Sequence, residues 1–376
     1  MLLENLRSRN EDTLRLLRRL VELESPSTSK EALDRLAGFL GECLTGVGAR
    51  VERIPSRTHG DLLRATWGSP GPGQVLVLCH MDTVWPVGEA CRRPFRLADG
   101  YAWGPGVYDM KGGIAQFLAA MATMRELGLV SARPVVAVLN SEEEVGSPVS
   151  RELIEEEGRQ SDYCLVLEPA GGPAGQIKTF RKGVGDFRVR VTGRPAHAGA
   201  DHARGVSATE ELAHQILRLH AMTDYEAGVT LNAGVIRGGS RSNVIAADAE
   251  AEVDFRVPTM DLAQALIRRV RSLTPVTPGA ELTIEGGLNR PPMERTPAIV
   301  ALFQKARALA CELGFDLEEG GTGGASDGNF VAALGTPVLD GLGAVGAGGH
   351  ALDERVAVDQ LPLRAALLVR ILQVFP

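Results

Sequence analysis

An apolar run that ends in two ionisable residues is the first feature of this sequence with chemical meaning. The run Val75–Cys79 is followed by His80 and, two positions later, by Asp82. Residues i and i+2 of a strand point to the same side, so the imidazole and the carboxylate would share one face of the strand end. Burying two ionisable groups together is costly unless the site uses them, and histidine is a common metal ligand.

Further carboxylates and a second histidine follow other apolar runs of the chain. They are Glu142, Glu143 and Glu144 after Val135–Leu139, Glu168 after Tyr163–Leu167, His350 after Pro337–Leu339, and Asp109 in the segment GPGVYDMKGG. Taken singly, a histidine at a strand end is usually a satisfied polar residue, and a glutamate triplet usually begins a solvated helix. Their joint position after several strands favours a functional site.

The elements expected to position these residues form an α/β layer. The four short apolar runs are typical of buried parallel strands, and helical patterns over residues 113–127 and 150–157 lie between them. This alternation predicts a mostly parallel mixed sheet with helices on both faces. Ligands of such sheets bind outside the carboxyl ends of the strands, so the ionisable residues should meet there.

A cluster this rich in carboxylates requires cations. Two divalent ions would neutralise three carboxylate ligands together with a bridging hydroxide, and mixed histidine and carboxylate ligands suit zinc, with cobalt or manganese as alternatives. Such ions lie about 3.5–4 Å apart and activate a bridging water near neutral pH. A carboxylate that does not bind the ions could then accept the water's proton.

Residues 182–291 follow a different pattern and are expected to form an inserted domain. The segment GDFRVRV alternates strictly between apolar and polar residues, and the predicted order of elements is β-α-β-β-α-β. That order is the ferredoxin-like α+β signature. The predicted catalytic, metal-binding domain is therefore discontinuous, comprising residues 1–181 and 292–376.

Composition excludes several classes of partner. The chain has 376 residues and a formal net charge of −7, with both signs interspersed, which argues against nucleic acid and anionic membranes. No apolar run approaches the roughly 20 residues of a membrane span, and the charged amphipathic N-terminus lacks a signal-peptide core, so we expect a cytoplasmic protein. The five cysteines are scattered and are expected to be reduced; strand alternation turns Cys79 away from His80, against a zinc thiolate.

The motifs taken in order resemble a known family. HMDTV, GPGVYDMKGG, NSEEEVGS, LEP, HAG, RSNVIAADAEAEVDFR, GGASDGNF and GAGGH are similar to those of the dinuclear zinc exopeptidases and deacylases. That family includes carboxypeptidase G-type glutamate carboxypeptidase, acetylornithine deacetylase and succinyl-diaminopimelate desuccinylase. The resemblance spans nearly the whole chain, and the GGASDGNF to GAGGH part is most similar to the glutamate carboxypeptidases.

The resemblance implies a role for each residue of the site. His80 and Glu168 would bind one metal ion, Glu144 and His350 the other, and Asp109 both. Asp82 would hold the His80 imidazole through its other nitrogen, and Glu143 would be the general base. Glu142 would be a neighbour on the solvent side, and a cis peptide bond would follow Asp109.

The resemblance also implies substrate-binding residues on the inserted domain. His197 would stabilise the oxyanion of the tetrahedral intermediate, usually in the partner subunit of a homodimer, with Asn243 beside it. Arg290 would bind a substrate carboxylate through two parallel hydrogen bonds. The alternatives are a capping or surface role for His197 and an exposed loop position for Arg290.

Several further residues are expected to have structural or surface positions. Arg256 should pair within the insert, and His59, His202, His214 and His220 should lie in loops or on the surface. Ala325 stands where the family tends to have glycine, which would be unfavourable if that position needed a positive φ.

The expected function is metal-dependent hydrolysis of an amide bond next to a free carboxylate, releasing a C-terminal amino acid from a small peptide or N-acyl amino acid. Deacylation of an N-acyl amino acid is the alternative activity. Two other classes are weighed: a non-catalytic metal-binding module of the same fold, and a dinucleotide-binding oxidoreductase suggested by GLGAVG at 341–346. The latter is disfavoured because no helix pattern follows the glycines.

Overall fold

The computed structural model describes residues 2–375 and separates into two compact units. The first contains the chain up to Phe180, Arg295–Thr322, and the chain from Ser326 onward. The second contains Arg181–Glu294 with Gly323–Ala325. The sequence-based prediction places the insert at residues 182–291.

A six-stranded mixed sheet forms the centre of the first unit. In spatial order its strands are β1 (Arg50–Ile54), β2 (Leu62–Trp67), β6 (Val135–Asn140), β3 (Gln74–His80), β7 (Ser161–Val166) and β14 (Val338–Leu339). The last four strands are mutually parallel, and β1 and β2 form an antiparallel edge. The four apolar runs are therefore the parallel strands that the sequence predicts.

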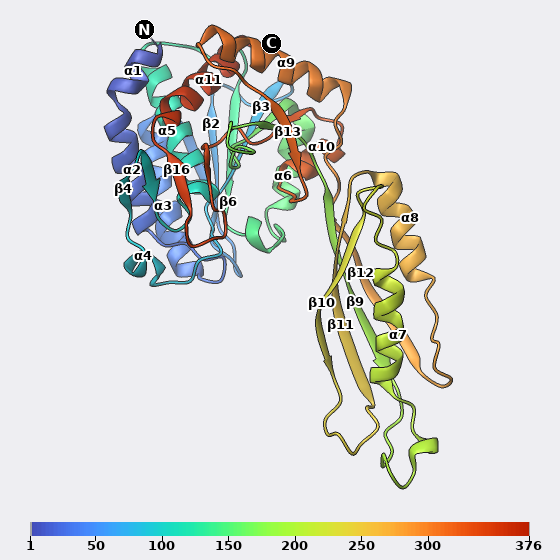
Figure 1. Ribbon diagram of the computed structural model, residues 1–376. Helices are drawn as coiled ribbons and strands as arrows, with labels where there is room; N and C mark the ends of the chain where they lie inside the picture. Colours follow the sequence, from blue (N-terminus) through green and yellow to red (C-terminus); the bar gives the residue numbers. More distant parts are fainter. Residues whose placement is uncertain (1, 376) are drawn as a thin grey trace. The chain divides into compact units, whose positions relative to one another are not determined.

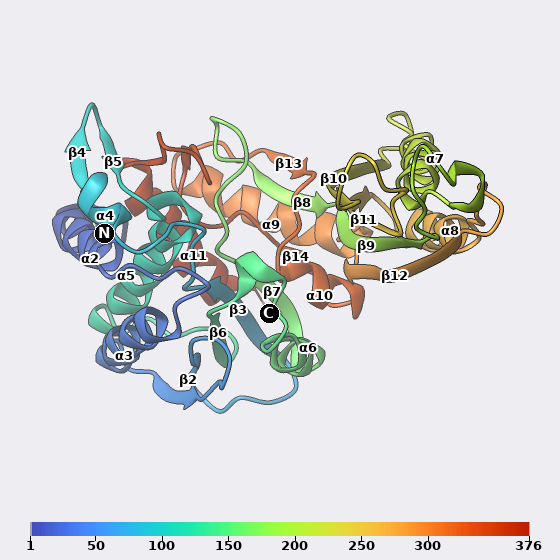
Figure 2. The same ribbon diagram turned by 90° about the horizontal axis from the view of Figure 1, so that it is seen from below.

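Helices cover both faces of this sheet (Figure 1, Figure 2). Val75, Val77 and Cys79 of β3 enter the large hydrophobic core together with residues of several helices. Four of these helices are α2 (Asn10–Glu22), α5 (Gly112–Glu126), α9 (Pro297–Glu312) and α11 (Gln360–Val374). On the opposite face, α6 (Arg151–Gln160) and α10 (Gly328–Ala333) contact β7. The predicted helices over 113–127 and 150–157 are α5 and α6.

Smaller elements complete the first unit. The amphipathic N-terminal segment is broken at Arg9 into α1 (Leu2–Ser8) and α2, and α3 (Lys30–Gly46) packs on β1 and β2. The remaining elements are α4 (Glu89–Arg92), a sheet of β4 (Arg96–Ala98), β5 (Tyr101–Trp103), β16 (Arg355–Ala357) and β15 (Gly346–Ala347), and the pair β8 (Ile177–Arg181) and β13 (Glu319–Thr322). No helix within residues 2–375 combines the length and the apolar character needed to cross a membrane.

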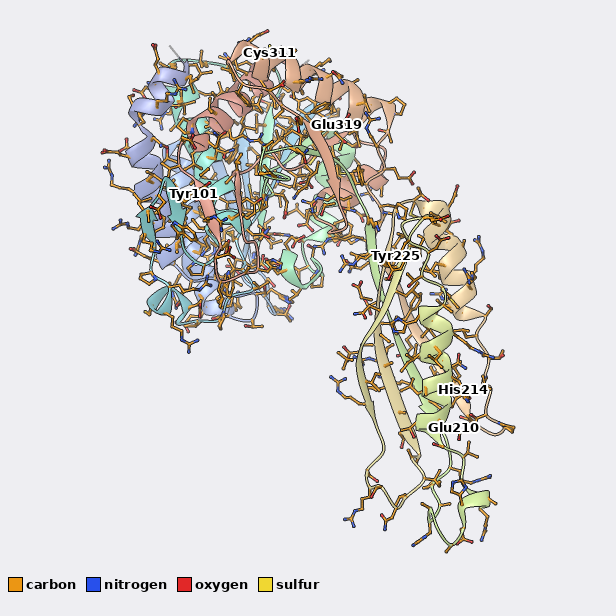
Figure 3. All side chains as sticks on the ribbon, in the orientation of Figure 1. Tyr101, Glu210, His214, Tyr225, Cys311 and Glu319 are labelled. Carbon is orange, nitrogen blue, oxygen red and sulfur yellow. The ribbon has the colours of Figure 1, made fainter. Side chains whose placement is uncertain are left out.

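The second unit has the predicted ferredoxin-like order. Its elements are β9 (Gly183–Thr192), α7 (Ala208–His220), β10 (Thr230–Gly238), β11 (Asp248–Val257), α8 (Met260–Arg271) and β12 (Glu281–Arg290). The strands form one antiparallel sheet in the order β10-β11-β9-β12, and both helices lie on one of its faces (Figure 1). Phe187 and Phe255 stack in its core. His214 on α7 is exposed, as predicted (Figure 3).

Candidate metal centre

The predicted ligands all belong to the first unit and come from segments that follow its strands. His80 is the last residue of β3, and Glu168 lies two residues beyond β7. Glu144 belongs to the short 3-10 helix η2 (Glu143–Val145), which follows β6. Asp109 lies in the irregular turn η1 (Val107–Lys111) that leads into α5, and His350 follows β15.

Asp109 stands between two histidines. Its Oδ1 lies 3.1 Å from His80 Nε2, and its Oδ2 lies 3.4 Å from His350 Nε2. His80 Nε2 is also 3.4 Å from Glu168 Oε1, and His350 Nε2 is 3.0 Å from Glu144 Oε1. The two groups, His80–Asp109–Glu168 and Asp109–Glu144–His350, each have ligand atoms within 4.8 Å of one another and share Asp109.

These separations fit a pair of divalent ions. Two ligand atoms bound tetrahedrally to zinc at about 2.0–2.1 Å lie roughly 3.3 Å from each other. The contacts between nitrogen and oxygen in both groups are 3.0–3.4 Å long. The donors are imidazole nitrogens and carboxylate oxygens, which suit zinc, and carboxylate-rich sites also accept manganese.

The pKa shifts in the site show that its carboxylates favour a nearby positive charge. Although burial opposes the charged imidazole, hydrogen bonds to Asp109, Asp82 and Glu168 raise the pKa of His80 well above its usual value. Asp109 and Glu144 raise the pKa of His350 to about 10. Burial opposes the charge of Asp109, but His350 and His80 lower the pKa of this carboxyl. Protons on two imidazoles thus balance the carboxylates, a role that divalent ions would fill.

Asp82 connects both halves of the site. His80 Nδ1 lies 3.0 Å from the main-chain oxygen of Asp82 and 3.5 Å from its Oδ1. The buried carboxylate of Asp82 also accepts hydrogen bonds from the main-chain N–H groups of Glu143 (3.1 Å) and Glu144 (3.2 Å), and from the Ser27 hydroxyl (2.7 Å). One side chain therefore orients a predicted ligand of the first ion and the main chain that carries the predicted base.

The prediction that Glu142 faces solvent is wrong. Its side chain is fully buried, and its carboxylate accepts hydrogen bonds from the N–H groups of Ser150 (2.7 Å), Val149 (3.3 Å) and Ser141 (3.1 Å). A buried carboxylate with main-chain donors is well satisfied, so Glu142 stabilises the conformation of the loop that contains Ser141, Val149 and Ser150. Glu143 and Glu144, the next two residues, lie between the buried and exposed classes.

A buried polar network supports the far end of the same loop. Asp327 accepts hydrogen bonds from the Asn140 amide and the Ser147 hydroxyl, and Asn140 also donates to Ser150 Oγ at 3.0 Å. Ser147 adopts a positive φ of 56°, which is uncommon for a residue with a side chain. This network could not be predicted from the sequence, because its members are ordinary polar residues that meet only in the fold.

The GLGAVG segment packs against the end of β7 and the residues that follow it, up to Glu168. Leu342 N donates to Val166 O at 3.1 Å, and Gly343 N donates to Glu168 O at 3.0 Å. A Cβ at Gly343 would collide with the main chain of Leu167, so glycine is needed for close approach. Strand β15, not a helix, begins at the last residue of the segment, Gly346. The dinucleotide-binding alternative is therefore wrong, and the glycines serve packing next to the site.

The first unit also contains a cis peptide bond and a buried thiol next to the predicted ligands. The Asp109–Met110 peptide bond is cis, as the resemblance implied. Cys79 is buried in the core, where the lack of solvent raises the pKa of its thiol far above normal. Such a thiol is inert rather than a metal ligand. Two residues of the site region were missed: the buried Lys111, and Glu354, whose carboxylate accepts hydrogen bonds from the loop of Asp109.

The predicted substrate-binding residues belong to the second unit, which brings two of them together. His197 pairs with Val244 in a β-bridge, and Ala198 N donates to the main-chain oxygen of Asn243 at 3.0 Å. Arg290 is elsewhere: it is the last residue of β12 and is only 6% exposed, so the exposed-loop alternative for it is wrong.

The geometry of β9 separates Arg290 from His197. Arg290 pairs with Val184 at the start of β9, whereas His197 follows the end of that strand at Thr192. The intervening strand spans about 26 Å. Within one chain, Arg290 therefore lies far from the pair formed by His197 and Asn243.

Arg256, Ala325 and the remaining histidines have structural or surface positions. Arg256 forms two hydrogen bonds with Asp254, so it is structural as predicted. Among the non-glycine residues of the described chain, only Asp99, Ser147 and His350 have a positive φ. Ala325 therefore occupies its position without the backbone cost that the sequence suggested. Both His202 and His220 are exposed, and His59 lies in a loop.

A largely parallel α/β sheet whose strand ends gather two overlapping groups of candidate ligands is the arrangement expected of a hydrolase that uses two metal ions. The comparison with protein families agrees with this class. The chain belongs to Peptidase family M20/M25/M40, whose profile matches residues 76–374. The resemblance noted from the motifs is thereby confirmed, and the chain is an M20-family hydrolase.

Individual relatives agree with this assignment. The chain is 30% identical to carboxypeptidase G2 of Pseudomonas sp. over 365 residues, which cover 96% of this chain and 88% of the relative. It is 31% identical to succinyl-diaminopimelate desuccinylase of Methylorubrum populi, with 93% and 95% of the two chains covered. Among solved structures, the YXEP protein of Bacillus subtilis, described as a dinuclear metal-binding peptidase of the M20 family, superposes with a TM-score of 0.72 at 13% identity, covering 97% and 98% of the two chains.

Proposed function

We propose that this protein hydrolyses an amide bond next to a free carboxylate and releases a C-terminal amino acid, using two divalent metal ions, with zinc preferred. His80 and Glu168 would hold one ion, Glu144 and His350 the other, and Asp109 both. The observation that carries the proposal is the placement of the two Asp109 oxygens against two different histidines.

Glu143 is the residue proposed to move protons. When bound, a pair of divalent ions polarises the scissile carbonyl and makes water nucleophilic near neutral pH. Glu143 accepts the proton of the attacking water and delivers it to the leaving nitrogen. Its main-chain N–H is held by Asp82, which fixes the start of its side chain beside the ligand Glu144.

The first unit contains a cavity whose lining residues are neighbours in the chain of two proposed ligands, although no proposed ligand lines it. A cavity of about 710 Å³ is lined by Tyr108 and Gly346–Gly348, which are near Asp109 and His350 in the chain. Volumes of this order hold small-molecule ligands in proteins. The Tyr108 hydroxyl donates to Ala170 O at 2.6 Å, which keeps this part of the wall in place.

His197, Asn243 and Arg290 are proposed to bind the substrate from two different chains of a homodimer. Arg290 would bind the free carboxylate, and His197 with Asn243 would stabilise the oxyanion. The separation of about 26 Å along β9 supports this arrangement, because one small substrate cannot reach both ends of the strand in a single chain. We also retain the cytoplasmic location as a proposal.

Replacement of Glu143 tests the proposed chemistry. Glu143→Ala should bind the same number of metal ions as the unaltered protein and lose about 10²–10⁴-fold in turnover, because only proton transfer is removed. Metal content is measured by elemental analysis and turnover by release of the amino acid. The exposed Glu156 on α6 provides a control, and Glu156→Ala should behave as the unaltered protein. Normal turnover of Glu143→Ala would refute the role, and fewer than one ion per chain in the unaltered protein would favour a non-catalytic module.

Deacylation of an N-acyl amino acid is a second candidate, favoured by the 31% identity to a desuccinylase. Both activities cleave an amide with the same metal centre, and they differ in the group on each side of it. A hydrolysis screen over N-acyl amino acids and dipeptides with added zinc or cobalt distinguishes them. A preference for acyl groups over peptides would replace the carboxypeptidase proposal.

A further inference from the structure

Glu354 is a buried carboxylate that lies four residues after the predicted ligand His350. It is only 1% exposed and immediately precedes β16. The main-chain N–H of Glu354 donates to Ala351 O, and that of Ala351 donates to Gly348 O. His350 is therefore enclosed in a tight turn, in which it has a positive φ of 61°, and Glu354 ends that turn.

The side chain of Glu354 binds the loop of Asp109 through its main chain. Oε1 accepts hydrogen bonds from the N–H groups of Tyr108 (2.9 Å) and Asp109 (3.0 Å), and Oε2 accepts one from Gly106 (2.8 Å). The indole N–H of Trp85 supplies a fourth donor at 2.9 Å. Main-chain N–H groups that converge on one anion fix the conformation of a loop.

This arrangement links both sides of the second ligand group. The main chain of Glu354 ends the turn of His350. Its side chain accepts a hydrogen bond from the N–H of Asp109, whose carboxylate faces both histidines. Trp85 extends the link to the segment after Asp82, and the Arg93 guanidinium lies 4.0 Å from the centre of its ring. Arg93 in turn donates to Leu352 O at 3.0 Å, within the turn between His350 and Glu354.

We propose that Glu354 is a positioning residue of the metal centre, which sets the distance between Asp109 and His350 and so the affinity of the ion they share. This inference rests on the proposed function, because it assumes that these residues bind metal. Glu354 itself contacts neither ion nor substrate; it acts through the main chain of Asp109 and the turn of His350.

Glu354→Gln is the sharpest test. A glutamine side chain has one acceptor oxygen and one NH₂ group. The NH₂ group would therefore face the N–H donors of either Tyr108 and Asp109 or Gly106 and Trp85, and those hydrogen bonds would be lost. Removal of supporting partners of metal ligands typically costs 10–100-fold in metal affinity or activity. We expect a loss of this size for at least one cobalt ion, a changed cobalt absorption spectrum, and a fall in kcat with little change in KM.

A second buried glutamate provides the matched control. Glu157 is 4% exposed and accepts hydrogen bonds from Arg64 and Gln74 at the opposite end of β3 from His80. Glu157→Gln should lower the thermal unfolding temperature but bind cobalt as the unaltered protein does. A merely structural role for Glu354 would give this same result.

The measurement is a cobalt titration of chelator-treated protein followed by visible absorption. If Glu354→Gln binds two cobalt ions with unaltered affinity and spectrum, the inference is overturned while the proposed function stands. If the unaltered protein binds no cobalt, the proposed function itself fails. Should the glutamine variant not fold, Glu354→Asp, which keeps the charge but is one methylene shorter, is titrated in its place with the same two criteria.

Discussion

At the scale of the residue, the centre is built around one carboxylate that faces two imidazoles. Asp109 contacts His80 with one oxygen and His350 with the other. In the absence of ions, the carboxylates raise the pKa of both histidines, because protonated imidazole is the nearest available positive charge. Divalent cations would supply this positive charge and leave the imidazoles neutral.

Glu142 offers a test at this scale, because its burial gives it a structural role. Glu142→Ala should lower the free energy of unfolding by roughly 1–3 kcal/mol, since the buried N–H groups of Ser150 and Ser141 lose their acceptor. Urea unfolding of the metal-free protein measures this. A loss below about 0.5 kcal/mol, as expected for a surface position such as Glu156, would contradict the assigned role.

The sequence predicted the residues that stand in motifs better than those that support them. His80, Asp109, Glu144, Glu168 and His350 each follow a strand or begin a helix, so their meeting could be inferred from the parallel sheet. Glu142 and Glu354 act by accepting main-chain hydrogen bonds. Nothing in a sequence indicates where a carboxylate will find buried N–H donors, because these depend on the final path of the loops.

At the scale of the element, the turn η1 joins the metal centre to the hydrophobic core. Lys111 at its end is 2% exposed, and its Nζ donates to Leu23 O at 2.9 Å. Burial lowers the pKa of this lysine from 10.5 to about 7, although Glu354 and Glu24 act in the opposite direction. The lysine that precedes α5 is therefore only partly protonated near neutral pH.

Lys111 makes stability depend on pH in a defined window. The unfolded lysine titrates near 10.4 and the folded one near 7, so between these values the unfolded state binds the extra proton and stability rises with pH. Below pH 7 both states are protonated, and the folded state bears the full cost of the buried charge. Lys111→Met removes this dependence.

The free energy of unfolding of the unaltered protein, relative to Lys111→Met, should therefore rise by up to about 1.4 kcal/mol per pH unit between pH 7 and 10. Urea unfolding of metal-free protein at pH 7 and 9.5 measures the change. Lys305→Met, at an exposed position of α9, is the control, and the difference in unfolding free energy between it and the unaltered protein should not change with pH. Parallel pH profiles for the unaltered protein and Lys111→Met would disprove the assignment.

Many elements with a clear period were predicted, although α3, β1 and β2 were not, and the shortest elements were missed. The parallel strands and α5 and α6 stand out as apolar runs and helical patterns. Helix α11 was not predicted, because burial of nearly its whole length from Leu361 to Leu372 removes the polar face that marks an amphipathic helix. The two- and three-residue strands β15, β16, β4 and β5 are too short for any alternation to be recognised.

At the scale of the whole molecule, the chain consists of a unit that contains the predicted ligands and a unit that contains His197, Asn243 and Arg290. The ferredoxin-like order of the second unit could be predicted because its strands are half-exposed and alternate strictly, as in β9. Sequence could not indicate that Arg290 and His197 would lie at opposite ends of that strand, since register is determined by pairing with β12.

Mixing two inactive variants tests whether a site draws on two chains. His197→Ala should lower turnover without loss of metal, and Glu143→Ala should do the same. In a mixed dimer one site would contain both intact residues, so unfolding and refolding the variants together should restore up to about a quarter of the unaltered activity, half of the dimers being mixed with one intact site each. Refolded mixtures that stay inactive would show that His197 acts within its own chain or has no catalytic role.

The chain enters and leaves the second unit at neighbouring points. Arg181 and Met293 exchange two main-chain hydrogen bonds of 3.0 Å, so the entry and exit strands lie side by side. An exchange of the segment between them would require only two adjacent junctions and would leave Gly323–Ala325 as the one other segment of this unit in the remaining chain. Recombination could therefore give one hydrolytic scaffold a different recognition module in a single event, which offers a simple route by which a common chemistry acquires new substrates.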